Sequence, residues 1–114
     1  DPPKITEKPR HQQVRASTIA SFYCEARGDP TPTIQWRKNG KRVPTTQSRY
    51  LVQEYPSGAL LRIEPVRGGR DDATYECAAE NGVGDAVSAE AQLTVYESEY
   101  CFYWDRLSVI RNVC

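Results

Sequence analysis

Two cysteines with a tryptophan between them constrain the fold of this chain more than any other feature. Cys24 lies in TIASFYCEA, Cys77 lies in TYECAAE, and Trp36 ends TIQW twelve residues after the first cysteine. In each segment apolar and polar residues alternate, which is typical of a half-buried β-strand. The alternation puts the two cysteines and the tryptophan on inward faces, so we expect them to share one interior.

The rest of the sequence also favours strands, and helical patterns are nearly absent. ALLRIEP and AEAQLTV continue the period of two, GDPTP indicates a loop, and NGVGD indicates a turn. Asn39-Gly40 is a strong turn dipeptide, so residues 34–43 are a predicted hairpin. The inward positions predicted in this way, besides the cysteines and the tryptophan, are Ala20, Phe22, Ala26, Ile34, Leu61, Ile63, Tyr75, Ala79, Ala91, Leu93 and Val95.

The Cys24, Trp36 and Cys77 spacing is that of an immunoglobulin sandwich, in which an indole packs on a disulfide between the sheets. Closing so long a loop stabilises a fold by about 4 kcal/mol in the chain-entropy model. Asp71-x-Ala73-x-Tyr75-x-Cys77 matches the tyrosine corner of such domains, and Arg49 lies where they often carry a basic partner for the aspartate. We therefore predict an all-β, immunoglobulin-like sandwich of two antiparallel sheets, with structural roles for Trp36, Asp71 and Tyr75.

Composition limits the class of protein. The 114 residues suffice for one modest core, no run is long enough for a membrane span, and DPPKITEKPR lacks the apolar stretch of a signal peptide, so we expect a mature chain or an excised piece. Four cysteines and one histidine form no Cys-x-x-Cys pair or histidine cluster, so we expect no metal site and no cofactor. Disulfides imply an oxidising compartment, and there is no usable N-glycosylation sequon.

The charges are segregated although the formal net charge is zero. Residues 37–49 hold five Lys or Arg and no acid, and residues 71–99 hold eight acids and no Lys or Arg. Charges that served only solubility would be interleaved, so this distribution suggests a basic patch. The alternative is a solvated turn beside a solvated strand.

Several stretches resemble one family closely. PPKITEKP, GDPTPTIQWRKNGKRV, RIEPVRGGRDD and ENGVGDAVSA resemble the first, membrane-distal I-set domain of LAR-type receptor protein tyrosine phosphatases, with the insect members nearest. The resemblance covers about residues 2–97, which gives an immunoglobulin domain at 1–97 and an atypical tail at 98–114. It implies an extracellular or cell-surface location and binding to heparan and chondroitin sulfate proteoglycans, in cell adhesion, axon guidance and synapse signalling.

The resemblance also implies a binding site for glycosaminoglycan. The family's basic loop maps onto the predicted hairpin, and two arginines precede the tyrosine corner. Asn39 departs from the pattern, since vertebrate members usually have a lysine there, and we expect the neighbouring Arg37 to compensate. A local ion pair with Asp71 and Asp72 is the alternative for the second arginine. The predicted site is Arg37, Lys38, Lys41, Arg42, Arg67 and Arg70, and replacing Lys38, Lys41 and Arg42 by alanine should abolish retention on heparin.

Other functions fit less well. Nucleic acid binding is not favoured, because the sequence has no recognition helix, no zinc finger and no aromatic platform beside the cations. For catalysis, no Ser or Cys nucleophile lies near His11 in the sequence. The spacing from Cys101 to Arg106 in CFYWDR is one residue short of a phosphatase loop, so we expect no enzyme. Adhesion through protein surfaces remains the alternative function.

Cys101 and Cys114 in the tail could pair, link two chains or stay free, and the tail could also come from a truncated gene product.

Overall fold

The computed structural model describes residues 1–46 and 48–96, together with the backbone of residues 102–104 and 109–111. Every regular element in these ranges is a β-strand, which confirms the predicted all-β class. The strands are β1 (Lys4–Glu7), β2 (Gln12–Arg15), β3 (Ala20–Arg27), β4 (Thr33–Lys38), β5 (Lys41–Arg42), β6 (Tyr50–Glu54), β7 (Gly58–Ile63), β8 (Ala73–Glu80), β9 (Val87–Tyr96), β10 (Phe102–Trp104) and β11 (Val109–Arg111).

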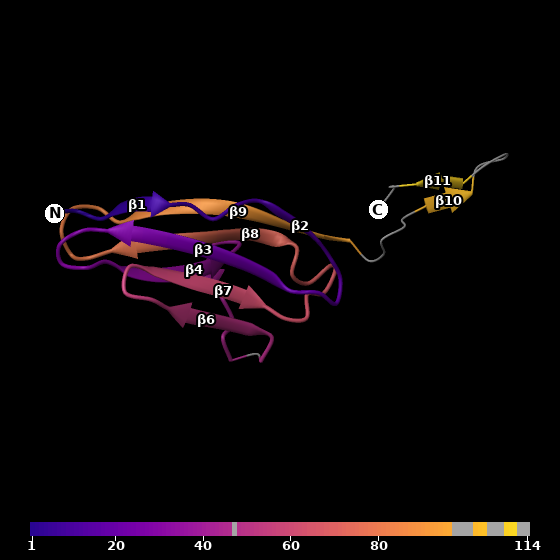
Figure 1. Cartoon of the computed structure of the whole chain (residues 1–114), viewed down its shortest axis with the longest axis horizontal. Helices are drawn as coiled ribbons and strands as arrows, with labels where there is room; N and C mark the ends of the chain where they lie inside the picture. Colours follow the sequence, from indigo (N-terminus) through magenta and orange to yellow (C-terminus); the bar gives the residue numbers. More distant parts are fainter. Residues whose placement is uncertain (47, 97–101, 105–108, 112–114) are drawn as a thin grey trace.

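The strands from β1 to β9 form two packed sheets (Figure 1). One sheet has the order β1-β3-β7-β6, and the other has the order β2-β9-β8-β4-β5. This is the predicted sandwich. In the tail, β10 and β11 form an antiparallel pair, and the remaining tail residues, including Cys101 and Cys114, lie outside the described residues.

One strand pair differs from the predicted antiparallel arrangement. β2 runs parallel to β9, with Val14 opposite Val95. The first strand of the chain is divided: β1 pairs with β3 in one sheet, and after the buried Pro9 the chain continues as β2 in the other. Proline donates no backbone hydrogen bond, so it suits the point where the chain changes sheets. Alternation of side chains cannot reveal this crossing, because both halves keep a period of two.

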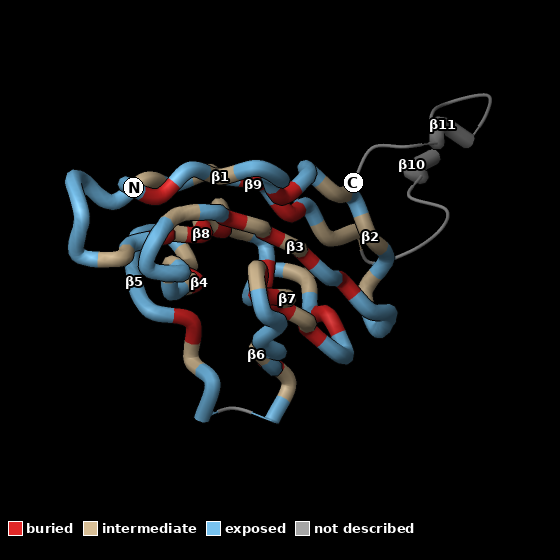
Figure 2. Tube along the Cα trace, turned by 60° about the vertical axis from the view of Figure 1, so that its left-hand side comes forward, coloured by how far each residue is buried: buried red, intermediate tan, exposed pale blue. Residues whose placement is uncertain are grey.

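The interior is built around the predicted disulfide. Cys24 of β3 and Cys77 of β8 are bonded, joining the two sheets, and Trp36 lies opposite Cys77 in the β4–β8 ladder. The Phe22 ring stacks on Tyr75 at 5.1 Å between centroids and lies 6.4 Å from Trp36. Buried residues alternate with exposed ones along the strands (Figure 2). In the described part of the chain, the buried core residues are Ala20, Phe22, Cys24, Ala26, Trp36, Val43, Tyr50, Ala59, Leu61, Ile63, Val66, Tyr75, Cys77, Ala79, Ala91 and Leu93.

The predicted hairpin forms, with its turn at Asn39-Gly40. Both residues have positive φ, 49° and 81°, the combination that a two-residue type I′ turn requires. The backbone N–H of Asn39 donates to the Thr74 carbonyl at 2.9 Å, and the side-chain oxygen of Asn39 accepts from the backbone N–H of Thr74 at 3.0 Å. Asn39 therefore fixes the tip of the hairpin to β8, a role that a lysine side chain could not fill.

Candidate basic site at the end of the sandwich

The cations of the hairpin divide between two faces. In the β4–β5 register, Arg37 lies opposite Arg42 and Lys38 lies opposite Lys41. Trp36 points inward, so its neighbour Arg37 projects from the outer face, where Glu76 of β8 stands directly across. The Lys38 side chain points to the same side of the sheet as that of Trp36, two residues earlier, but Lys38 is the last residue of β4. Its side chain therefore reaches the end of the sandwich rather than the outer face.

The two arginines on the outer face have partners. Arg37 Nη1 lies 3.3 Å from Glu76 Oε1, with the two side chains 42% and 22% exposed. The Gln35 amide, oriented with its oxygen toward Arg42, accepts from Nε at 2.7 Å and from Nη2 at 3.1 Å. A carboxylate thus neutralises Arg37 locally, and an amide orients Arg42. Neither arginine stands free on the hairpin as the sequence suggested.

Lys38 connects the hairpin to the turn that carries the two predicted arginines. Its Nζ donates to the Arg70 carbonyl at 2.5 Å and to the Tyr50 hydroxyl at 3.1 Å. It also lies 5.4 Å from the centre of the Tyr50 ring, within range of a cation–π contact. The structure therefore brings residues 37–42 and 67–70 together, and Lys38 is the contact between them.

The buried Asp71 anchors the 67–70 turn. Its carboxylate is wholly buried and accepts from Arg49 at 2.6 and 3.1 Å and from the Arg67 backbone N–H at 2.6 Å, and the Tyr50 hydroxyl donates to it as well. The Tyr75 hydroxyl donates to the Asp71 carbonyl at 2.8 Å, which is the predicted tyrosine corner. Burial alone would raise the pKa of Asp71, but the donors from Arg49, Tyr50 and Arg67 outweigh it and hold that pKa below its usual range.

Three of the six predicted cations are exposed and unpaired. Among the described residues, no ion pair or hydrogen bond involves the side chains of Lys41, Arg67 or Arg70. The alternative of a local ion pair for Arg70 is not what the structure shows. Asp71 is taken by Arg49, and Asp72 accepts from the backbone N–H groups of Gly69 and Val95.

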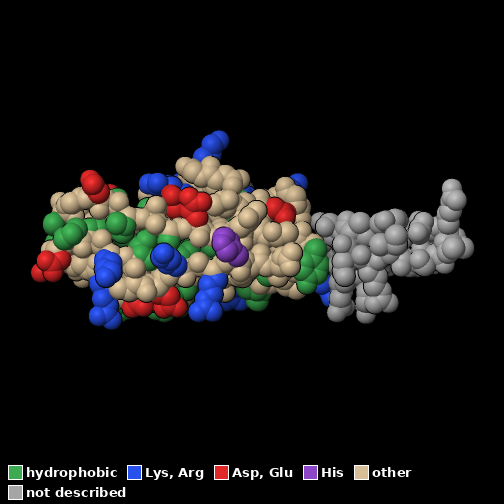
Figure 3. Space-filling model, turned by 90° about the horizontal axis from the view of Figure 1, so that it is seen from above, with side chains coloured by type: hydrophobic (Ala, Val, Ile, Leu, Met, Phe, Trp, Pro, Cys, Tyr) green, Lys and Arg blue, Asp and Glu red, His purple; other side chains and the backbone are tan. Residues whose placement is uncertain are grey.

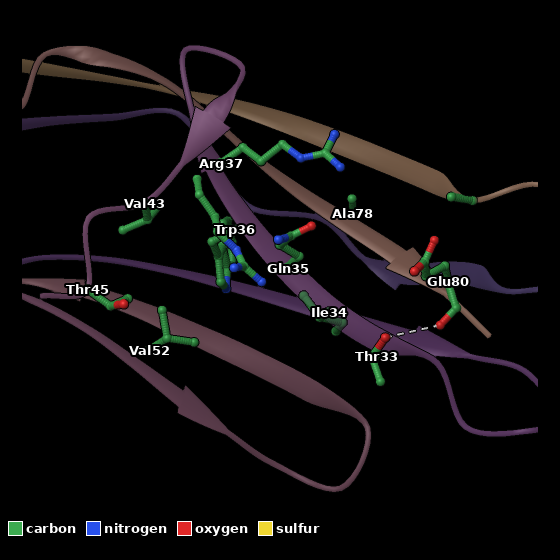
Figure 4. Close-up of a pocket in the computed structure, with 12 residues that line it drawn as sticks. Thr33, Ile34, Gln35, Trp36, Arg37, Val43, Thr45, Val52, Ala78 and Glu80 are labelled. Carbon is green, nitrogen blue, oxygen red and sulfur yellow. Dashed lines mark hydrogen bonds between the residues drawn. The ribbon is translucent and has the colours of Figure 1, made fainter. Parts of the chain in front are cut away.

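A groove of about 550 Å³ runs along β4 beside the hairpin, and Arg37 and Arg42 are among the residues that line it. Trp36 and Val52 form part of its wall, and Val43 and Thr45 line it on the connecting loop (Figure 4). Trp36 Nε1 is buried and has no hydrogen-bond partner among the described residues. Across the described residues there is no cluster of three possible metal ligands, and no helix is long and apolar enough to span a bilayer.

Comparison with known proteins identifies the family of domains. The Immunoglobulin I-set domain family matches residues 3–95. Tyrosine-protein phosphatase Lar of Drosophila melanogaster is 68% identical over 99 residues, which are 86% of this chain and 5% of that protein. Receptor-type tyrosine-protein phosphatase F of Danio rerio is 40% identical over 95 residues, 83% of this chain and 5% of that protein. The chain thus spans about a twentieth of the length of these relatives.

A solved structure agrees in both fold and sequence. The crystal structure of the N-terminal Ig1-2 module of the Drosophila receptor protein tyrosine phosphatase DLAR is 66% identical and superposes with a TM-score of 0.83. The match covers 87% of this chain and 51% of that one. The similarity therefore lies in an immunoglobulin domain and not in a phosphatase domain.

Proposed function

Because the chain belongs to the immunoglobulin I-set family and is similar to the N-terminal immunoglobulin domain of LAR-type receptor tyrosine phosphatases, we propose that it is an extracellular recognition module that binds sulfated glycosaminoglycans. Its partners would be heparan and chondroitin sulfate proteoglycans, in cell adhesion and axon guidance. The chain itself would contribute binding and no catalysis.

The observation that supports this proposal is the group of unpaired cations at one end of the sandwich. Lys41 on β5 and Arg67 and Arg70 on the 67–70 turn are exposed, and Lys38 joins the two segments. We call Lys38, Lys41, Arg67 and Arg70 the end cluster. Sulfate groups repeat along a glycosaminoglycan, so a surface that presents several cations without ion-pair partners can neutralise several of them at once.

The backbone under the end cluster is held by hydrogen bonds before any ligand binds. Asn39 ties the hairpin tip to β8, and Asp71 binds the backbone of the 67–70 turn. Binding therefore has to immobilise side chains but not loops, which reduces its entropy cost. Arg37 and Arg42 lie on the adjacent outer face and would extend the contact only for a chain long enough to bend around the β4–β5 hairpin.

The native chain should be retained on immobilised heparin and displaced by free heparan or chondroitin sulfate. Double-stranded DNA at matched salt and matched charge concentration should displace it less well, because nothing in the end cluster reads bases and phosphate contacts alone give only non-specific affinity. Measuring the concentration of each polyanion that releases half of the bound chain tests this. Equal displacement by all polyanions would show non-specific ion exchange and would contradict the proposal.

A further inference from the structure

The edge strand β1 carries charges in an arrangement that the proposed site does not use. In the β1–β3 ladder, Lys4 lies directly opposite Arg27, and Glu7 lies directly opposite Glu25. Like charges placed opposite each other across an antiparallel pair destabilise a sheet. Two such pairs of opposite sign, one after the other on a four-residue strand, are not explained by the stability of this sheet alone.

A bulge brings both pairs to the same face of the sheet. The register advances two residues on β1, from Ile5 to Glu7, and only one on β3, from Ala26 to Glu25. Ile5 packs against the core, and in a regular strand Glu7 would point to the same inner face. The bulge at Thr6 turns Glu7 outward, so Lys4 and Glu7 share the outer face.

The acidic pair on this face also acts on the neighbouring Tyr23. Burial raises the pKa of the Tyr23 hydroxyl on β3, and the carboxylates of Glu25 and Glu7 raise it further. Lys4, Glu7 and Arg27 are exposed, and β1 is the last strand of its sheet: within the described part of the chain, no strand besides β3 is hydrogen-bonded to it, although β9 of the other sheet lies nearby. The edge of β1 that faces away from β3 is therefore the place where a further strand could extend this sheet.

We propose that a second copy of this chain pairs with β1, edge to edge and antiparallel. The sequence Lys4-Ile5-Thr6-Glu7 is complementary to itself in this direction. A two-fold axis between Ile5 and Thr6 puts Lys4 of one copy opposite Glu7 of the other, twice. Across the interface, Arg27 and Lys4 of one copy then lie in line with Glu7 and Glu25 of the other. Each like-charged pair therefore faces a pair of opposite sign.

The same charges select for a second copy rather than for other strands. Short, bulged and charged edges protect sheets from pairing with foreign strands, which would leave the charges of β1 unmatched. The face that carries β1 and β9 shows basic and acidic side chains interspersed (Figure 3). A glycosaminoglycan would be repelled by the acids of such a face, whereas a protein surface of matching pattern would not. The proposal is therefore independent of the end cluster.

Sedimentation equilibrium without polyanion tests this pairing. The full 114-residue chain would carry Cys101→Ser and Cys114→Ser, so that no intermolecular disulfide can form between them. A four-residue edge is a small interface, so we expect a weak dimer with a Kd of about 0.1–1 mM at low salt. Lys4→Glu and Glu7→Lys should each raise the Kd at least about tenfold, because each places like charges across the two-fold axis.

The two charge reversals also provide the decisive control. The Lys4→Glu chain has two acids on β1 and the Glu7→Lys chain has two bases, so an equimolar mixture should form a heterodimer although each alone is monomeric. The double variant, Lys4→Glu with Glu7→Lys, should dimerise again, and Lys41→Glu on the hairpin should not affect the dimer. A wild-type chain that stays monomeric to about 1 mM, or a mixture that fails to associate, would overturn the proposal.

Discussion

Replacing Lys41, Arg67 and Arg70 together by alanine is expected to weaken heparin binding about a hundredfold, while the midpoint of thermal unfolding stays within about 2 °C of the native value. Each exposed cation in contact with a sulfate contributes at most about 1 kcal/mol, and three such contacts account for the hundredfold loss. No described hydrogen bond or ion pair involves these side chains, so their removal leaves the fold intact. Titration calorimetry with a defined heparin oligosaccharide measures the affinity.

A matched triple variant separates the position of the charges from their number. Lys8→Ala, Arg10→Ala and Arg62→Ala remove the same net charge from other parts of the surface. This control should bind within about threefold of the native chain, since only the long-range field changes. Arg37→Ala should also have a small effect, because Glu76 already neutralises that guanidinium. If the two triple variants lost affinity equally, the end cluster would not be the site.

Asp71→Ala is expected to reduce the free energy of unfolding by about 3–5 kcal/mol, because it removes one partner of a buried ion pair. Arg49 would lose its carboxylate, and the Tyr50 hydroxyl and the Arg67 N–H would lose their acceptor. Asp72→Ala is the neighbouring control: that exposed carboxylate accepts from the backbone N–H groups of Gly69 and Val95, and its loss should cost about 1 kcal/mol. Denaturant unfolding followed by tryptophan fluorescence measures both.

The role of Asp71 also predicts a dependence on pH. Its folded-state pKa lies below the unfolded value of about 3.9, so the carboxylate stabilises the fold above that pH. The stabilisation is lost as the pH falls through the folded-state pKa. The difference in stability between the native chain and Asp71→Ala should therefore be constant from about pH 5 upward and shrink below about pH 4. A difference that stayed constant down to pH 2 would mean that packing, not charge, explains the effect.

The fold was predictable because its determinants are local patterns. The period of two placed Cys24, Trp36 and Cys77 inward, and the Asn39-Gly40 turn is where the dipeptide predicted it. The parallel β2–β9 pair was not predictable in this way. It depends on where the chain crosses between sheets, and side-chain alternation is the same in either sheet.

The site was only partly predictable, because sequence proximity does not give the direction of a side chain. Arg37, Lys38, Lys41 and Arg42 are close in sequence, yet alternation on the hairpin sends the two arginines to one face and the two lysines to the other. The cross-strand partner Glu76 could have been found, since pairing Trp36 with Cys77 also pairs Arg37 with Glu76. The contacts of Lys38 with Tyr50 and Arg70 required the folded chain.

The central claim is that glycosaminoglycan binding is ionic and is carried by the end cluster. The most direct measurement is the salt dependence of heparin affinity, for the native chain and for the Lys41, Arg67 and Arg70 triple variant. For the native chain, the logarithm of the association constant should fall against the logarithm of salt concentration with a slope of about −3.6, because each of the four cations of the end cluster contributes about −0.9. For the triple variant the slope should be close to −1, as only Lys38 remains. Equal slopes for the two proteins would contradict the account.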